Sequence, residues 1–144
     1  MGVTIEQIED ALSKTLIGKP PKEIFILDGV INVPTEEGVK YAIAMAKPHE
    51  SVAVFTPLSR IDSIYHEMLH QGLFGMGLLK GEMIADLGGK LLAFKYQLPG
   101  VKKREVKYEL CINCSSHEEI LDRLGIKPLF KGEPVIKHYL LVKP

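Results

Sequence analysis

The residues best suited to chemistry are the five of His66-Glu67-Met68-Leu69-His70. On a helix, two histidines four positions apart lie one above the other, so both imidazoles can reach one tetrahedral metal ion. Glu67 lies beside this pair, where its carboxylate can accept a proton from a metal-bound water. This spacing predicts metal-assisted hydrolysis, with one zinc ion as the cofactor.

The expected helix has one apolar and one polar side, since successive residues turn by about 100°. The apolar side is made of Ile61, Ile64, Tyr65, Met68, Leu69 and Gly72. His66 and His70 lie almost opposite, flanked by Asp62, Ser63 and Glu67. The histidines avoid the side that would pack into a core, which argues against a pair of core histidines. A plain solvated polar face stays open as the alternative.

A zinc site with two histidines needs a third protein ligand, and catalysis needs the fourth position open. The nearest downstream carboxylate is Glu82, at the start of a second predicted helix. Asp86 follows on the same side, which Gly89 and Ala93 continue, and the large residues lie opposite: Met83, Ile84, Leu87, Leu91 and Phe94. Small residues let another helix approach closely, so we expect Glu82 to bind the metal and Asp86 to hold a ligand imidazole. The alternatives are a carboxylate favoured at a helix N-terminus for Glu82 and an exposed charge for Asp86.

His66-Glu67-Met68-Leu69-His70 followed by Glu82-Met83-Ile84-Ala85-Asp86 resembles the gluzincin metallopeptidases. These carry HExxH on an active-site helix and ExxxD on a later glutamate helix. The interval from His70 to Glu82 is much shorter than in thermolysin-like members, so the chain is most similar to the minimal soluble gluzincins, the minigluzincins. The resemblance covers roughly residues 59–96. It implies that His66, His70 and Glu82 bind zinc, that Glu67 is the general base and that Asp86 supports His66.

The expected reaction is hydrolysis of peptide bonds, with Glu67 taking a proton from the zinc-activated water and passing it to the leaving amine. The partner is then a peptide or protein substrate, which could add in extended form to a strand edge at residues 51–56 or at Asp28-Gly29. Gluzincins also stabilise the oxyanion with a Tyr or His, for which the candidates are Tyr96, Tyr108, His138 and Tyr139. Two rivals are a catalytically silent or latent zinc-binding or protein-interaction module, and a hydrolase of another amide.

A second group of possible ligands is Cys111-Ile112-Asn113-Cys114 with His117 three residues on. A structural zinc site needs four ligands, and only His117 and the distant His138 could complete one. The alternatives are ordinary thiols, a second metal site, a disulfide or redox pair, and a thiol that occupies the catalytic metal in a latent form.

Composition excludes several other classes of protein. The 144 residues carry 18 Lys+Arg and 18 Asp+Glu, which argues against a nucleic-acid binder. The basic cluster of Lys102, Lys103, Arg104 and Lys107 is too short for such a footprint. We expect no signal peptide and no membrane span, and two cysteines in such a chain suggest a cytoplasmic location. Asn and Gln number only 5, a thermophile trait that we take as a hypothesis.

The elements around these residues predict a single α+β domain, residues 1–144, with a small mixed sheet. Thr4 and Gln7 form a capping box for a helix that continues to Gly18. The runs 23–27 and 30–33 flank Asp28-Gly29, which predicts a two-residue hairpin. We further expect a helix over 35–46 and a buried strand over 51–56.

The histidine helix is expected to begin at Ser59, with Asp62 completing its cap, and to end near Gly72. A glycine-rich reversal and the glutamate helix, Glu82 to about Tyr96, come next. The last third predicts a strand over 106–112, a helix over 116–124 and a strand over 135–142.

Overall fold

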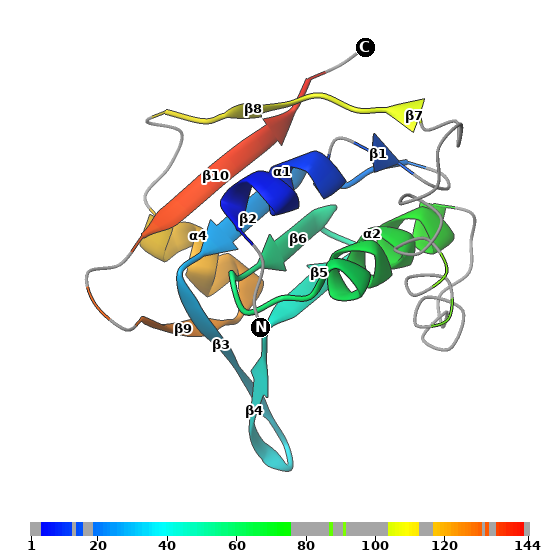
Figure 1. Ribbon diagram of the computed structural model, residues 1–144. Helices are drawn as coiled ribbons and strands as arrows, with labels where there is room; N and C mark the ends of the chain where they lie inside the picture. The colour runs from blue at the N-terminus through cyan, green and yellow to red at the C-terminus, as the bar shows by residue number, and fades with distance from the viewer. Residues whose placement is uncertain are drawn as a thin grey trace.

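Ten strands and three helices are placed in the part of the chain that the structure, a computed structural model, describes. That part comprises residues 4–12, 14–15, 19–75, 87, 91, 104–112, 117–130, 132 and 135–142. Helices and strands form one α+β domain around a small mixed sheet, as the sequence predicts (Figure 1). Among the described residues, none of the helices combines the length and apolarity needed to cross a bilayer.

The main sheet has five strands in the order β5-β6-β2-β10-β8. Their bounds are β5 Ala44–Lys47, β6 Val52–Phe55, β2 Glu23–Leu27, β10 Ile136–Leu141 and β8 Tyr108–Leu110. β2 and β6 are parallel, and the other neighbours are antiparallel. The buried strand expected over 51–56 is therefore confirmed as β6.

Strands β2 and β6 are buried on both faces, which explains their nearly continuous apolar sequences. Ile24 and Phe55 pack on one face with residues of α1, Ile5–Leu12, and α2, Ile61–Gly75. Phe25 and Val54 pack on the other face with Leu124 of α4, His117–Leu124. The helices thus cover both faces, with α2 close to the β5 end of the sheet.

Helix α1 begins with the predicted capping box. The Thr4 amide donates to Gln7 Oε1 at 2.9 Å, and the Gln7 amide donates to Thr4 Oγ1 at 3.1 Å. The expected extension to Gly18 is wrong, because the helix ends at Leu12 and Lys14–Thr15 form the short strand β1. β1 pairs with β7, Arg104–Glu105, and this pairing competes with continuation of the helix.

The two-residue hairpin at Asp28-Gly29 is not formed, although strands lie on both sides of it. β2 already has β6 and β10 as neighbours, so β3, Gly29–Thr35, continues into a second sheet of order β4-β3-β9. Gly29 is required there for close approach, because a Cβ at this position would meet the backbone carbonyl of Leu129 on β9, Lys127–Phe130. The sequence analysis did not predict β9.

The helix expected over 35–46 is also wrong. The chain instead turns at Glu36-Glu37, runs back as β4, Gly38–Ala42, and continues as β5. Gly38 has φ +117°, a value that L side chains rarely adopt, and the Thr35 hydroxyl donates to the Gly38 carbonyl at 2.6 Å. This turn closes a β3–β4 hairpin that projects from the domain (Figure 1).

The strand, helix and strand predicted for the last third are present as β8, α4 and β10, and the unpredicted β9 lies between α4 and β10. The second predicted metal-site helix, Glu82 to about Tyr96, lies almost wholly outside the described residues. Within it only Leu87 and Leu91 are described, and both are helical and exposed.

Candidate metal centre

Helix α2 is fixed to the sheet at its N-terminal end. The Ile64 amide donates to the Arg60 carbonyl, so the first helical hydrogen bond begins at Arg60. The cap expected from Ser59 is wrong, because the Ser59 hydroxyl donates to the Ile43 carbonyl at 2.9 Å and accepts from the Thr56 amide at 3.3 Å. Asp62 pairs with Arg60 at 3.2 Å. Ser59 therefore ties the start of α2 to the residue that precedes β5.

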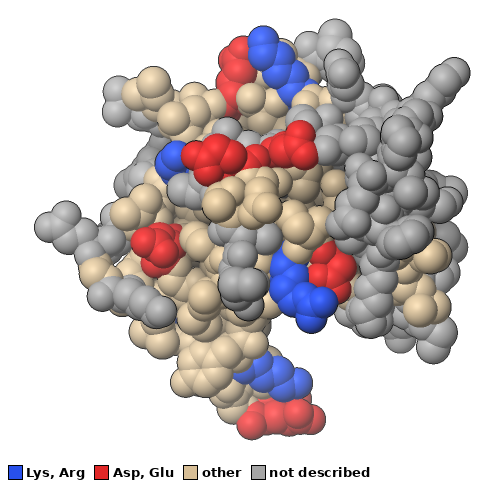
Figure 2. All heavy atoms as spheres, in the orientation of Figure 1, with Lys and Arg blue, Asp and Glu red and all other residues tan. Residues whose placement is uncertain are grey.

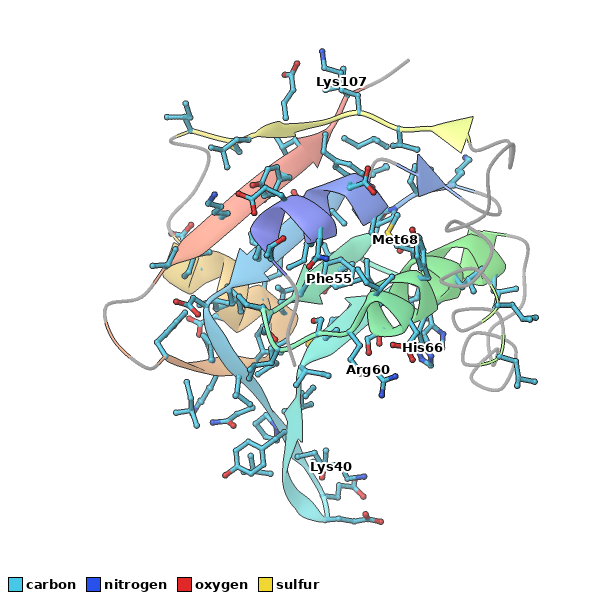
Figure 3. All side chains as sticks on the ribbon, viewed as in Figure 1. Lys40, Phe55, Arg60, His66, Met68 and Lys107 are labelled. Carbon is cyan, nitrogen blue, oxygen red and sulfur yellow. The ribbon has the colours of Figure 1, made fainter. Side chains whose placement is uncertain are left out.

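The predicted division of α2 into two sides is confirmed. Ile64, Tyr65 and Met68 are buried in the core cluster, whereas His66 and His70 are half-buried on the polar side. Figure 3 shows Met68 directed into the interior between α1 and α2, with His66 on the outer side of the helix. The core-facing apolar stripe thus fixes the rotation of α2 and leaves the histidines outside the core.

The two imidazoles converge. Nε2 of His66 and Nε2 of His70 are 3.0 Å apart, and the ring centroids are 4.7 Å apart with the planes inclined by 70°. A zinc ion bound tetrahedrally at 2.0–2.1 Å would separate two ligand nitrogens by roughly 3.3 Å, so the pair needs only a small adjustment to share one ion. A hydrogen bond between the two neutral rings gives the same contact, and both arrangements fit this geometry.

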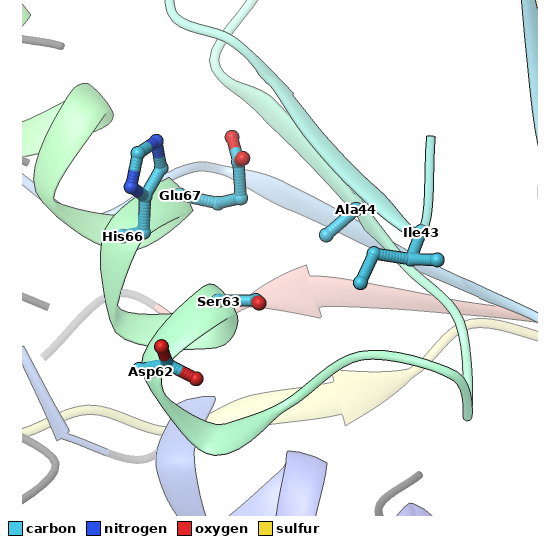
Figure 4. A pocket seen from close by; sticks show the side chains of 6 residues that line it. All are labelled: Ile43, Ala44, Asp62, Ser63, His66 and Glu67. Carbon is cyan, nitrogen blue, oxygen red and sulfur yellow. The ribbon is translucent and has the colours of Figure 1, made fainter. Parts of the chain in front are cut away.

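A surface pocket of about 220 Å³ is lined by His66 of this pair. Its walls are Ile43 and Ala44 on one side and, on the α2 side, Asp62, Ser63, His66 and Glu67. Figure 4 shows the Glu67 carboxylate between His66 and Ala44. The predicted general base, Glu67, thus lies in the wall of this pocket next to the predicted ligand His66.

Strand β5 forms the other side of this pocket. Ala44 and Ala46 lie opposite Phe55 and Ala53 of β6, and therefore on the sheet face that α2 covers. Their small side chains leave space between strand and helix. This wall was not predicted, because residues 35–46 were expected to be helical. The small-residue alternation of Ala42, Ala44 and Ala46 was the signal that could have shown it.

The strand edge beside the pocket is β5, which among the described strands pairs only with β6. The edge expected at residues 51–56 is wrong, because β6 has β5 on one side and β2 on the other. Asp28-Gly29 does not provide an edge at this site either, since it carries the chain from β2 to the second sheet.

The expected third ligand, Glu82, and its companion Asp86 lie outside the described residues. Within the described residues, no group of three or more His, Cys, Asp and Glu side chains is placed to hold a metal. The structure thus brings together His66, His70 and Glu67, and the roles of Glu82 and Asp86 stay predictions.

Three of the four oxyanion candidates lie away from the pocket. The Tyr108 hydroxyl donates to the Pro21 carbonyl at 2.7 Å, and burial raises the pKa of this tyrosine above its ordinary value. Tyr139 is buried in the core, and His138 is stacked on Phe25 with ring centroids 4.2 Å apart. The fourth candidate, Tyr96, is outside the described residues.

Cys111 follows strand β8 and is disulfide-bonded. Its amide donates to the His138 carbonyl at 2.7 Å, which fixes it against β10. The only other cysteine in the chain, Cys114, lies outside the described residues, as does the side chain of His117. A disulfide leaves no thiolate on Cys111, which favours the disulfide among the alternatives for this cysteine over a metal-binding thiol.

Comparison with known proteins gives no match: no protein family, curated protein or solved structure is significantly similar to the chain. Similarity to a protein of known function therefore supports no assignment, and the function has to be inferred from the residues and their arrangement.

Proposed function

We propose that this protein is a zinc-dependent peptidase of gluzincin type, most similar to the minigluzincins. The observation that carries the proposal is the 3.0 Å convergence of the His66 and His70 Nε2 atoms beside a pocket that has Glu67 in its wall. The HExxH and ExxxD motifs add chemical support, because together they provide three ligands, a base and an orienting carboxylate.

Zinc would be held by His66, His70 and Glu82. When bound, such an ion lowers the pKa of a water toward 7 and polarises a carbonyl. Glu67 would accept the proton of the attacking water and deliver it to the departing amine. Asp86 would hold the ring N–H of His66 and so present the other ring nitrogen to the metal.

An extended peptide would lie along β5. This strand has one side open among the described strands, and its start borders the pocket at Ala44. Main-chain hydrogen bonds to an edge strand bind a peptide independently of its sequence, and pockets for alternate side chains add specificity. The small volume beside Ala44 and Ser63 favours a substrate with a small or medium side chain next to the scissile bond.

The test is proteolysis of a pool of unfolded protein by the zinc-loaded chain and by Glu67→Gln. We expect Glu67→Gln to bind zinc in equal stoichiometry and to lose cleavage by ~100-fold or more, since positioned acid–base catalysis contributes 10²–10⁴-fold. Ser63→Ala serves as a matched variant of the same pocket wall that keeps the base.

Equal cleavage by wild type and Glu67→Gln would reject the peptidase proposal. Stoichiometric zinc without cleavage of any peptide or protein would favour the alternative, a silent or latent zinc-binding module. Cleavage restricted to small non-peptide amides would favour a hydrolase of another amide.

A further inference from the structure

The segment that forms the pocket wall continues beyond it as a second open edge. Residues 38–47 form β4 and then β5, which are the outer strands of the two sheets. Among the described strands, β4 pairs only with β3 and β5 only with β6. Figure 1 shows the two strands following each other from the hairpin tip to the side of α2. If straight, ten residues of strand would extend about 33 Å, far beyond the pocket itself.

Ile43, which joins β4 to β5, is hydrogen-bonded to the segment that leads into α2. The Ile43 carbonyl accepts hydrogen bonds from the Thr56 amide at 3.1 Å, the Thr56 hydroxyl at 2.7 Å and the Ser59 hydroxyl at 2.9 Å. Thr56 and Ser59 are buried and directly precede α2. The hairpin is therefore attached to the same framework that positions the histidine pair.

One face of the hairpin sheet exposes large apolar side chains to solvent. The register places Val30 opposite Leu129, Asn32 opposite Tyr41 and Lys127, and Pro34 opposite Val39. We call this set the hairpin face. Its exposed fractions are large, 68% for Tyr41, 56% for Val39 and 53% for Leu129.

The opposite face of the same strands packs inward, with Ile31, Val33, Ala42 and Phe130 in the second core cluster. The hairpin face therefore adds nothing to the core, and Lys127 is the one charged member of its pairs. Figure 2 shows the hairpin as mostly uncharged surface, with charged side chains gathered at its tip. Several large apolar side chains exposed on one face of a sheet are typical of an interaction surface.

We propose that the β4 edge and the hairpin face form an exosite for an extended, apolar segment of an unfolded polypeptide. The inference rests on the proposed function, because the bound segment would belong to the same chain that lies along β5 at the pocket. Two consecutive open edges offer main-chain donors and acceptors that only an extended chain can match. Side chains alternate along a strand, so every second residue of the bound segment would lie beside Val39 and Tyr41, the β4 residues of the hairpin face.

Continuity with the pocket favours this occupant over a folded partner. A segment seated on β4 leads through the Ile43 junction to Ala44, which lines the pocket. A chain long enough to reach both places must be unfolded over many residues. The substrate class is therefore an unfolded protein with apolar residues at alternate positions remote from the scissile bond.

The experiment measures binding of fluorescein-labelled, reduced and carboxymethylated α-lactalbumin by fluorescence anisotropy. The full-length Glu67→Gln chain, with zinc, is compared with the same chain carrying Tyr41→Lys or Val39→Lys. Each added change is expected to raise the Kd about tenfold, the effect of losing one well-placed interface residue. Both residues are exposed, so the fold should tolerate a lysine at either position.

Leu110→Lys is the matched control. Leu110 is 51% exposed on β8, the outer strand at the other end of the main sheet. The Leu110→Lys change should leave the Kd for the probe unchanged. Failure of the Glu67→Gln chain to bind the probe, or equal Kd values with Tyr41→Lys and Val39→Lys, would overturn the exosite.

A second copy of the chain is the other occupant to exclude. If sedimentation velocity shows a dimer that Tyr41→Lys dissociates, the hairpin face is a subunit interface and the exosite is wrong. Binding that depends on Tyr41 in a chain that cleaves nothing would keep the docking surface and reject the peptidase. Cleavage by the wild-type chain, with probe binding that is independent of Tyr41 and Val39, would keep the peptidase and reject the exosite.

Discussion

The two ends of the five-stranded sheet contain the same kinds of residue in opposite environments. At the β5 end, His66 and His70 are half-buried, with their Nε2 atoms 3.0 Å apart beside an open pocket. Toward the β8 end, His138 is 6% exposed and stacked on Phe25, and the Tyr108 hydroxyl donates a hydrogen bond to the Pro21 carbonyl. Residue type alone therefore does not identify the site.

The two ends differ in the space that the neighbouring strand leaves beside the histidines. Ala44 gives α2 a small-residue partner, and the pocket between this residue and the helix has space for water or a substrate. On β10, His138 is instead stacked against the ring of Phe25 on the neighbouring strand β2. A histidine with an aromatic ring stacked on it stabilises the fold, whereas one at the wall of an open pocket can exchange ligands.

The largest expected effect separates the two ends directly. His70→Ala should weaken zinc binding by more than ~100-fold, because loss of a partner that only supports a ligand already costs 10–100-fold. His138→Phe should keep the zinc affinity of the wild type, since its ring lies on the sheet face opposite α2. Competition with a chromophoric chelator measures both. Zinc affinity that depends on His138 and not on His70 would reverse the assignment of the two ends.

A graded effect is expected from the two carboxylates of the glutamate helix. Glu82→Ala should weaken zinc binding strongly, because two histidines alone leave the ion under-coordinated. Asp86→Ala should cost less, about 10–100-fold in affinity or activity. Isothermal titration with zinc tests the order. Equal affinity in Glu82→Ala and wild type would refute the glutamate-helix assignment, and full activity in Asp86→Ala would make that residue a surface charge.

The parts of the fold that could be predicted from sequence are those specified by local patterns. The Thr4–Gln7 capping box and the i, i+4 histidine pair on an apolar-striped helix both need only residues within a few positions. The same holds for β6, whose unbroken apolar run matches a strand buried on both faces.

The errors arose where partners distant in sequence decide the structure. Asp28-Gly29 has the composition of a hairpin turn, but β10 and β6 occupy both sides of β2. The segment 35–46 became two strands because β3 and β6 were available as partners and Gly38 allowed the turn. That error hid the strand wall of the pocket and the continuous edge. A pattern in one sequence can indicate a strand, but it does not say which strands pair with it.

The smallest expected effect tests the structural role of the β8 end. Tyr108→Phe removes the hydroxyl that donates to the Pro21 carbonyl, so the free energy of unfolding should fall by about 1 kcal/mol at pH 8. Burial raises the pKa of Tyr108 above its ordinary value of 10.0, so the folded chain keeps a proton that the unfolded chain releases above pH 10. The stabilisation is therefore complete below pH 10 and is lost as the pH rises, by at most about 1.4 kcal/mol per pH unit. Urea unfolding between pH 8 and 11 should show the difference between wild type and Tyr108→Phe shrinking above pH 10. If the difference in free energy of unfolding between the two proteins stays constant over this range, Tyr108 is not held in a buried, protonated state. The β8 end of the sheet would then not have the structural role that distinguishes it from the β5 end.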